Sequence, residues 1–173
     1  INLDRLRYLS EILPPNVTPL YSSQETIAKN ISDSDLIIGA VLIPGAAAPK
    51  LMSRDLISRM KKGAVVVDVA IDQGGCFETS KATTHQTPTY VVDDVVHYCV
   101  ANMPGGVART ATIALNNATL PYALALADDP VNALFRDANL QSGLNVHKGS
   151  VTYKAVADAL GYDYVPAYEA LKA

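Results

Sequence analysis

The residues of this chain best suited to chemistry follow the largely apolar run 65–71, which ends in Asp72, Gln73 and two glycines, Gly74 and Gly75. A carboxylate in this place can transfer a proton or orient the amide of a cofactor. The glycines leave space for a ligand, although an Asx turn in which glycine supplies a positive φ explains the same pattern. Because ligands of parallel sheets bind where the carboxyl ends of the strands open into loops, we favour a functional role for Asp72.

Two further loops follow predicted strands. The loop 39–45 carries small residues and a proline, which allow a flat ligand close to the backbone, but an ordinary connection between strand and helix is an equally good interpretation. The segment 102–106 offers an amide, a methionine and backbone donors suited to a carboxylate or carboxamide, and it could equally be the approach to a helix. Since the loops after Ala40, Val69 and Ala101 follow successive strands, we expect them to line one edge of the sheet.

For the remaining polar and sulfur-containing candidates, a structural role is a better interpretation than a functional one. Lys81 and Arg5 could each meet an anionic ligand, but solvated surface cations are the default. The three histidines have unrelated spacings, so we expect solvated or structurally hydrogen-bonded roles for them; they are His85, His97 (placed just before a strand) and His147. Cys76 and Cys99 follow different strands without metal-type spacing, which predicts buried free thiols and no metal site.

The elements that must position these residues are predicted from periodicity and end signals. Ser23 and Ser53 are predicted N-caps, Asp93 and Asp94 form a predicted turn, and the strand 64–69, apolar at nearly every position, suits coverage on both faces. The intervals imply right-handed crossovers, so the fold class is α/β: a partial doubly wound parallel sheet followed by a helical segment returning to a second domain. The predicted helices are 3–13, 24–31, 54–60, 108–127, 132–137 and 152–160, and the predicted strands are 17–21, 35–40, 64–69, 88–92 and 97–101.

Composition excludes several classes of function. The 173 residues suffice for one good core, or for one domain and part of another. The net charge of -3 favours neither a nucleic-acid surface nor an acidic tail. The apolar stretches are too short to span a bilayer and no signal-peptide pattern is present, so we expect a soluble, cytoplasmic protein that binds neither nucleic acid nor membrane. Because Ile1 is not a methionine and a helix follows at once, we expect the chain to begin inside an element.

Three long motifs, in this order, are similar to those of bacterial L-alanine dehydrogenases, within the alanine dehydrogenase/transhydrogenase NAD-binding family. They are residues 38–51 (IGAVLIPGAAAPKL), 68–78 (DVAIDQGGCFE) and 98–104 (YCVANMP), and the likeness extends over essentially the whole chain. The NAD-binding part of proton-translocating transhydrogenase shares the Pro-Gly-x-x-Ala-Pro-Lys-Leu pattern. Its central loop typically carries a glutamate followed by Asn- and Gly-rich sequence, where this chain has Asp72 followed by residues 73–76, so we favour the dehydrogenase.

The resemblance implies reversible, NAD-dependent oxidative deamination of L-alanine to pyruvate and ammonia. Hydride would pass from the alanine Cα to the nicotinamide, and water would then attack the imine. Asp72 matches the family's catalytic aspartate, which helps to activate that water, and Asn102 would face the substrate. Arg5 and Ser22 would lie near the adenosine end of the cofactor and Lys81 near its phosphates or ribose. The implied cofactor-binding residues are Arg5, Ser22, Val41, Leu42, Val69, Ala70, Ile71, Asp72, Lys81, Val100, Ala101, Asn102 and Met103.

The resemblance also implies what lies elsewhere in such enzymes. The glycine-rich turn and ribose-binding acid of the family precede the equivalent of Ile1, and its substrate-holding arginine, lysine and histidine lie further upstream. Residues 1–107 would form the C-terminal half of an NAD-binding Rossmann domain, and residues 108–173 a connecting helix and a returning segment of the substrate domain. We expect the missing N-terminal portion and further copies, a homo-hexamer, as partners, and the fragment alone to be inactive. Two other hypotheses stay open: a non-catalytic nucleotide-binding or assembly module, and the NAD-binding component of a transhydrogenase.

Overall fold

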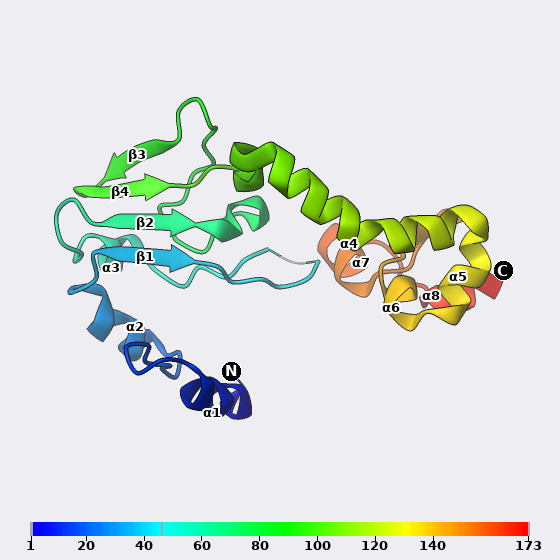
Figure 1. Cartoon of the computed structure of the whole chain (residues 1–173), viewed down its shortest axis with the longest axis horizontal. Coiled ribbons are helices and arrows are strands. Elements are labelled where there is room, and N and C mark those ends of the chain that lie inside the picture. Colours follow the sequence, from blue (N-terminus) through cyan, green and yellow to red (C-terminus); the bar gives the residue numbers. More distant parts are fainter. Residues whose placement is uncertain (1, 46, 173) are drawn as a thin grey trace. The chain divides into compact units, whose positions relative to one another are not determined.

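The computed structural model of the chain describes residues 2–45 and 47–172 (Figure 1). Ile1, Ala46 and Ala173 lie outside the described residues. The expectation that the chain begins inside an element at Ile1 therefore falls outside them as well. The chain divides into two units that are described separately below. The first consists of Ile1–Leu42 and Ala48–Ala101, and the second of Ile43–Ala47 and Asn102–Ala173.

The first unit is built around a four-stranded sheet with the order β1-β2-β4-β3. β1, β2 and β4 are parallel to one another and β3 is antiparallel to β4, as the arrows in Figure 1 show. The predicted α/β class with a mainly parallel sheet is therefore confirmed. The elements of this unit are α1 (Leu3–Ile12), α2 (Gln24–Ile31), β1 (Leu36–Gly39), α3 (Arg54–Ile57), β2 (Val65–Asp68), the 3-10 helix η1 (Val69–Gln73), β3 (Thr89–Val92) and β4 (Val95–Tyr98).

Side-chain caps fix where the first helices begin. The Ser23 side chain accepts a hydrogen bond from the Thr26 N–H at the start of α2, and Ser53 does the same for Leu56 at the start of α3, as predicted. The predicted strand 17–21 is wrong, because none of these residues joins a ladder in the described part of the chain. Its central residue, Pro19, has no N–H to donate to a neighbouring strand.

The β3–β4 hairpin turns at the two aspartates predicted for this role. Asp93 and Asp94 have φ values of 52° and 64°, the left-handed region that a tight two-residue hairpin turn requires. The Arg54 guanidinium binds Asp93 through two hydrogen bonds, Nε to Oδ2 at 2.9 Å and Nη2 to Oδ1 at 3.1 Å. This pairing holds the pKa of Asp93 below its ordinary value and ties α3 to the hairpin.

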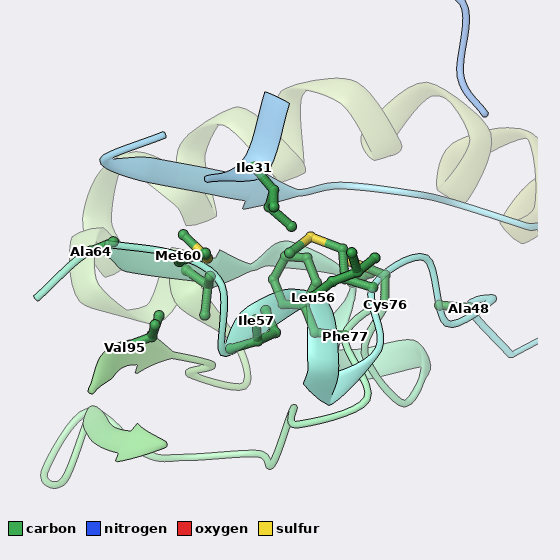
Figure 2. Close-up of a cluster of buried hydrophobic side chains, with 12 residues drawn as sticks. Ile31, Ala48, Leu56, Ile57, Met60, Ala64, Cys76, Phe77 and Val95 are labelled. Carbon is green, nitrogen blue, oxygen red and sulfur yellow. The ribbon is translucent and has the colours of Figure 1, made fainter. Parts of the chain in front are cut away.

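One cluster of buried side chains forms the core of the first unit. Figure 2 shows Ile31 pointing from the end of α2 toward the group that contains Leu56, Cys76 and Phe77. Helices α2 and α3 pack against the same cluster, and β2 and β4 contribute Val66 and Val95 to it. The buried members are Ile31, Ala48, Met52, Leu56, Ile57, Met60, Ala64, Val66, Ala70, Cys76, Phe77 and Val95.

The burial of β2 alternates along the strand. Val66 and Asp68 are buried, whereas Val65 and Val67 are half-buried. Helices α2 and α3 both lie against the cluster that contains Val66, and coverage of the second face of this strand stays a prediction. β1 forms one edge of the sheet, and its Ile38 side chain is 60% exposed.

The second unit is mainly helical. Its long helix α4 contains no buried residue and continues through Pro121. A two-stranded hairpin that was not predicted from the sequence turns at Lys148 and Gly149, both with positive φ. The elements are η2 (Met103–Val107), α4 (Ala108–Asp128), α5 (Pro130–Arg136), α6 (Ala138–Ser142), β5 (Val146–His147), β6 (Ser150–Val151), α7 (Lys154–Leu160) and α8 (Ala167–Lys172). No helix among the described residues has both the length and the apolar character needed to cross a membrane.

His97, which was expected at the start of the predicted strand 97–101, lies inside β4 (Val95–Tyr98) and is fully buried. Its Nδ1 lies 2.9 Å from the Val95 carbonyl, which can only accept, so Nδ1 carries the proton and Nε2 accepts from the Thr79 hydroxyl at 2.7 Å. The ring stacks on Tyr90 with 4.9 Å between centroids. Burial lowers the pKa of His97 below its ordinary value, so the folded protein holds a neutral imidazole.

This burial predicts a loss of stability in mild acid. Because the pKa of His97 is lower in the folded than in the unfolded state (about 6.5), the unfolded chain binds more protons below that pH. The contribution is complete above the unfolded value and is lost as the pH falls toward the folded value, by up to about 1.4 kcal/mol per pH unit. Urea unfolding between pH 5 and 7, about the range in which histidine titrates, measures it. We expect the slope to flatten in His97→Phe and to persist in the exposed control His85→Gln; an equal slope in both variants would contradict this account.

Candidate functional site

The carboxyl ends of β1 and β2 lie side by side because the two strands are parallel and in register, Gly39 opposite Asp68. The chain segments that leave these ends enclose a cavity of about 400 Å³. Its walls are mainly apolar, and its polar side chains are those of Asp72 and Gln73. The lining residues are Ala40, Val41, Leu42, Val69, Ala70, Asp72 and Gln73. The structure thus gathers five of the predicted site residues, Val41, Leu42, Val69, Ala70 and Asp72, around one cavity.

The 3-10 helix η1 carries Asp72 out of the sheet. It starts directly after β2 and ends at Gln73, and its C-cap Gly74 has a φ of 89° and donates its N–H to the Ile71 carbonyl. Gly75 follows with a φ of 75°. A Cβ at Gly75 would lie within 2.6 Å of both the Asp68 carboxylate and the Ser80 side chain, so glycine is required here for space as well as for conformation. The resulting turn leaves the Asp72 side chain exposed at the rim of the cavity.

Asp68, the last residue of β2, is fully buried and holds the loop that follows. Its carboxylate accepts hydrogen bonds from the Cys76 N–H at 2.9 Å, from the Phe77 N–H at 3.5 Å and from the Ser80 hydroxyl. The Cys76 thiol donates to the same carboxylate at 3.5 Å. Burial and the adjacent Asp68 raise the pKa of Cys76 to about 12, so this thiol stays protonated at neutral pH. Both cysteines are buried and free, as predicted.

Asp68 was not among the residues predicted from the sequence to have a role. The available signal was an acid inside an otherwise apolar strand, because a buried carboxylate persists only where several donors meet it. Those donors come from positions eight to twelve residues further along the chain. Nothing in the local pattern identifies them.

A second segment runs beside the loop and completes its backbone hydrogen bonding. The Ala48 N–H donates to Gln73 O at 2.9 Å and the Leu51 N–H donates to Cys76 O at 2.7 Å. Met52 and Phe77 then form a parallel bridge. Residues 48–51, the last part of the 38–51 motif, therefore hold the backbone of the loop that follows Asp72 by hydrogen bonds.

Three predicted cofactor residues lie at other places. Arg5 is exposed on α1, with its guanidinium 4.9 Å from the centre of the Tyr8 ring. Ser22 lines a groove of about 350 Å³, together with residues of α2 and β1 and with Leu51 and Met52. Lys81 is exposed, and its backbone N–H donates to the Tyr90 hydroxyl at 2.7 Å. None of these three residues lines the cavity beside Asp72.

The remaining candidates are two buried residues, the exposed Ala101 and two residues of the second unit. The side chains of Ile71 and Val100 are buried. Ala101 is exposed and pairs its N–H with the Thr83 carbonyl at 3.1 Å. In the second unit, Asn102 has a left-handed backbone with a φ of 56° and lines a cavity of about 580 Å³, and Met103 is half-buried at the start of η2.

Parallel strands joined by a helix, with an acid-bearing cavity at their carboxyl ends, define an α/β protein of the doubly wound class, in which ligands bind at that edge. The chain matches the family model described as "Alanine dehydrogenase/PNT, C-terminal domain" over residues 1–154. It belongs to this alanine dehydrogenase/PNT family, as the three sequence motifs indicated.

Curated relatives and solved structures agree with this assignment. The chain is 59% identical over 167 residues to "Alanine dehydrogenase" of Halomonas elongata, covering 96% of this chain and 45% of that relative. It is 53% identical over 174 residues to "Alanine dehydrogenase" of Bacillus subtilis, covering 99% and 46%. A solved structure named "L-alanine dehydrogenase" superposes with a TM-score of 0.80 at 48% identity, over 93% of this chain and 45% of that one. The chain thus spans about half the length of the relatives it matches.

A transhydrogenase structure is a weaker match. The crystal structure of transhydrogenase from Sinorhizobium meliloti gives a TM-score of 0.56 at 28% identity, over 78% of this chain and 36% of that chain. Its identity to this chain is well below that of the alanine dehydrogenase structure. The residues after Asp72 favoured the dehydrogenase over the transhydrogenase, and the higher identity to the alanine dehydrogenase structure agrees with that preference.

The buried carboxylate predicts a large effect of one substitution. In Asp68→Asn an amide nitrogen faces donors that have lost their acceptor, so we expect the free energy of unfolding to fall by about 2–4 kcal/mol. The matched control is Asp35→Asn, because the Asp35 carboxylate is 84% exposed and pairs only with Lys61 among the described ion pairs. Its loss should change stability by less than about 1 kcal/mol. Urea unfolding of both variants distinguishes them, and similar losses would mean that Asp68 does not hold the loop.

Proposed function

We propose that the protein that carries this chain catalyses the NAD-dependent, reversible oxidative deamination of L-alanine to pyruvate and ammonia. The observation that supports this most is the exposed Asp72 at the rim of an apolar cavity where β1 and β2 end. Relatives at 53–59% identity bear the name alanine dehydrogenase. The motif that contains Asp72 is the one that resembles the catalytic loop of these enzymes.

The cavity fits one end of a dinucleotide cofactor. Val41, Leu42 and Val69 offer apolar walls to a flat ring, and Leu42 is 71% exposed, which leaves apolar surface for such a ring to cover. NAD, when bound, would supply the acceptor for the hydride of the alanine Cα. Ser22, Arg5 and Lys81 would serve the adenosine, ribose and phosphates at the other parts of the first unit.

Asp72 would carry the proton chemistry. A carboxylate at the rim of the cavity can accept a proton from the water that attacks the imine, and can return a proton as ammonia leaves. Its backbone stays fixed by η1, while its side chain reaches the solvent side of the cavity. Asn102, held in a left-handed conformation before η2, would contact the substrate.

The complete enzyme would need more than this chain. Because the chain spans about half of its relatives, we propose that the remaining portion supplies the other strands of the nucleotide-binding sheet and the groups that hold the substrate carboxylate. Residues 108–173 would form the connecting helix and the returning segment of the substrate domain, and residues 1–107 the C-terminal half of the NAD-binding domain. We further propose a homo-hexamer in the cytoplasm, and no turnover by the 173 residues alone.

The second candidate is the NAD-binding component of a transhydrogenase, which the solved structure at 28% identity favours. Such a component binds NAD without oxidising alanine. The two candidates therefore differ in one measurable respect, the formation of NADH from L-alanine.

NADH formation from L-alanine and NAD by the complete protein tests the proposal. We expect steady turnover, and a fall in kcat of about 10²–10⁴-fold in Asp72→Asn, because the amide cannot accept the proton. The control is Asp55→Asn on the surface of α3, which should retain activity within about twofold, as expected for a surface change. Nucleotide binding without NADH formation would support the transhydrogenase component instead. Full activity of Asp72→Asn would remove Asp72 from the catalytic role.

A further inference from the structure

Lys50 directs its ammonium group into the turn that follows Asp72. The Nζ lies 2.6 Å from the Gly74 carbonyl oxygen, 2.8 Å from that of Gly75 and 3.2 Å from that of Phe77. An ammonium group has three N–H donors, and each has a carbonyl acceptor here. An ordinary surface lysine pairs with one carboxylate, as Lys62 does with Asp94 at 3.0 Å, whereas Lys50 binds three backbone carbonyls.

The same turn is held from its other side by Asp68. The Asp68 carboxylate accepts the N–H groups of Cys76 and Phe77, whereas Lys50 binds the carbonyls of Gly74, Gly75 and Phe77. Within residues 74–77, a cation therefore binds three of the carbonyls and an anion binds two of the amides. Charge-assisted hydrogen bonds of this kind are stronger than neutral ones, and two opposite charges fix the direction of the peptide dipoles between them.

The turn 74–77 is also hydrogen-bonded to the last residues of η1. The Gly74 N–H donates to Ile71 O at 2.9 Å, and the Gly75 N–H donates to Ala70 O at 3.0 Å. Asp72 lies between the residues joined by these bonds. Glycine has the widest choice of backbone conformation, so the positive φ values of Gly74 and Gly75 must be selected by their hydrogen bonds.

We propose that Lys50 is a positioning residue for the reaction, which sets the turn 74–77 and through it the direction of the Asp72 carboxylate. This inference rests on the proposed function of Asp72. A lysine suits the task better than an arginine, because three acceptors converge on one point charge and a planar guanidinium cannot aim three donors at them from one atom.

Kinetics of the complete protein test this role. Lys50→Met keeps the length and apolar stem but removes the donors. We expect kcat for alanine oxidation to fall by about 10–100-fold, with the KM values for NAD and alanine changed by less than about threefold, since misplacing a reacting group by about 1 Å costs up to about 10²-fold. Lys62→Met, which removes an exposed lysine, is the control and should keep kcat within about twofold.

A double-mutant cycle separates positioning from a general loss of structure. If Lys50 acts through Asp72, adding Lys50→Met to Asp72→Asn should lower kcat by less than about twofold further, because the group that Lys50 directs is already lost. An undiminished further loss of about 10–100-fold would overturn the proposal. If Lys50→Met fails to fold, Lys50→Arg replaces it; we expect a smaller fall in kcat with unchanged KM values, and wild-type kcat in a folded Lys50→Arg variant would likewise overturn the proposal.

A measurement without turnover distinguishes this inference from the proposed function. If the wild-type protein forms no NADH from alanine, the proposed function fails, and amide hydrogen exchange of the same complete protein still reports on the turn. We expect Lys50→Met to speed exchange at the Gly75 and Cys76 amides at least about tenfold, while core amides such as Val66 keep their rates, because local opening is then independent of global unfolding. Unchanged exchange at Gly75 and Cys76 would contradict the role of Lys50.

Discussion

The buried carboxylate of Asp68 is the interaction on which the rest of the first unit depends. A carboxylate without solvent is strongly unfavourable unless several donors meet it, and here every donor comes from the loop that follows β2. The strand and the loop are therefore stable only together. This one requirement explains why Gly75 must be a glycine, why Cys76 stays a thiol, and why the chain turns sharply enough to leave Asp72 at the edge of the sheet.

The second constraint is the parallel arrangement of β1 and β2. It brings the chain segments after both strands to one edge, where small and apolar residues enclose a cavity beside Asp72. The segment 48–52 closes this edge by pairing with the loop. Two of the three family motifs are thus hydrogen-bonded to each other: residues 48–51 of the first motif pair with the loop of the second motif, which carries Asp72. The backbone beside Asp72 is hydrogen-bonded to this segment, and the Asp72 side chain is exposed.

Local features of the fold could be predicted from the sequence, whereas long-range contacts could not. The caps at Ser23 and Ser53 and the turn at Asp93 and Asp94 depend on neighbouring residues, and all were predicted correctly. The strand at 17–21 was wrong because pairing depends on a partner that the local pattern does not reveal. The contacts of Lys50 join residues 24 to 27 positions apart, so no spacing rule could identify them. Asp72 could be proposed from the sequence because glycines and a β-branched run mark its position locally.

Isotope transfer tests the central claim, that the edge bearing Asp72 serves the oxidation of alanine by NAD. The complete protein would be incubated with NAD and L-alanine deuterated at Cα, and the mass of the nicotinamide product would be measured. Direct hydride transfer predicts NADH that carries one deuterium. NADH without deuterium, or no NADH from a folded protein that binds NAD, would contradict the account and assign this sheet edge to nucleotide binding alone.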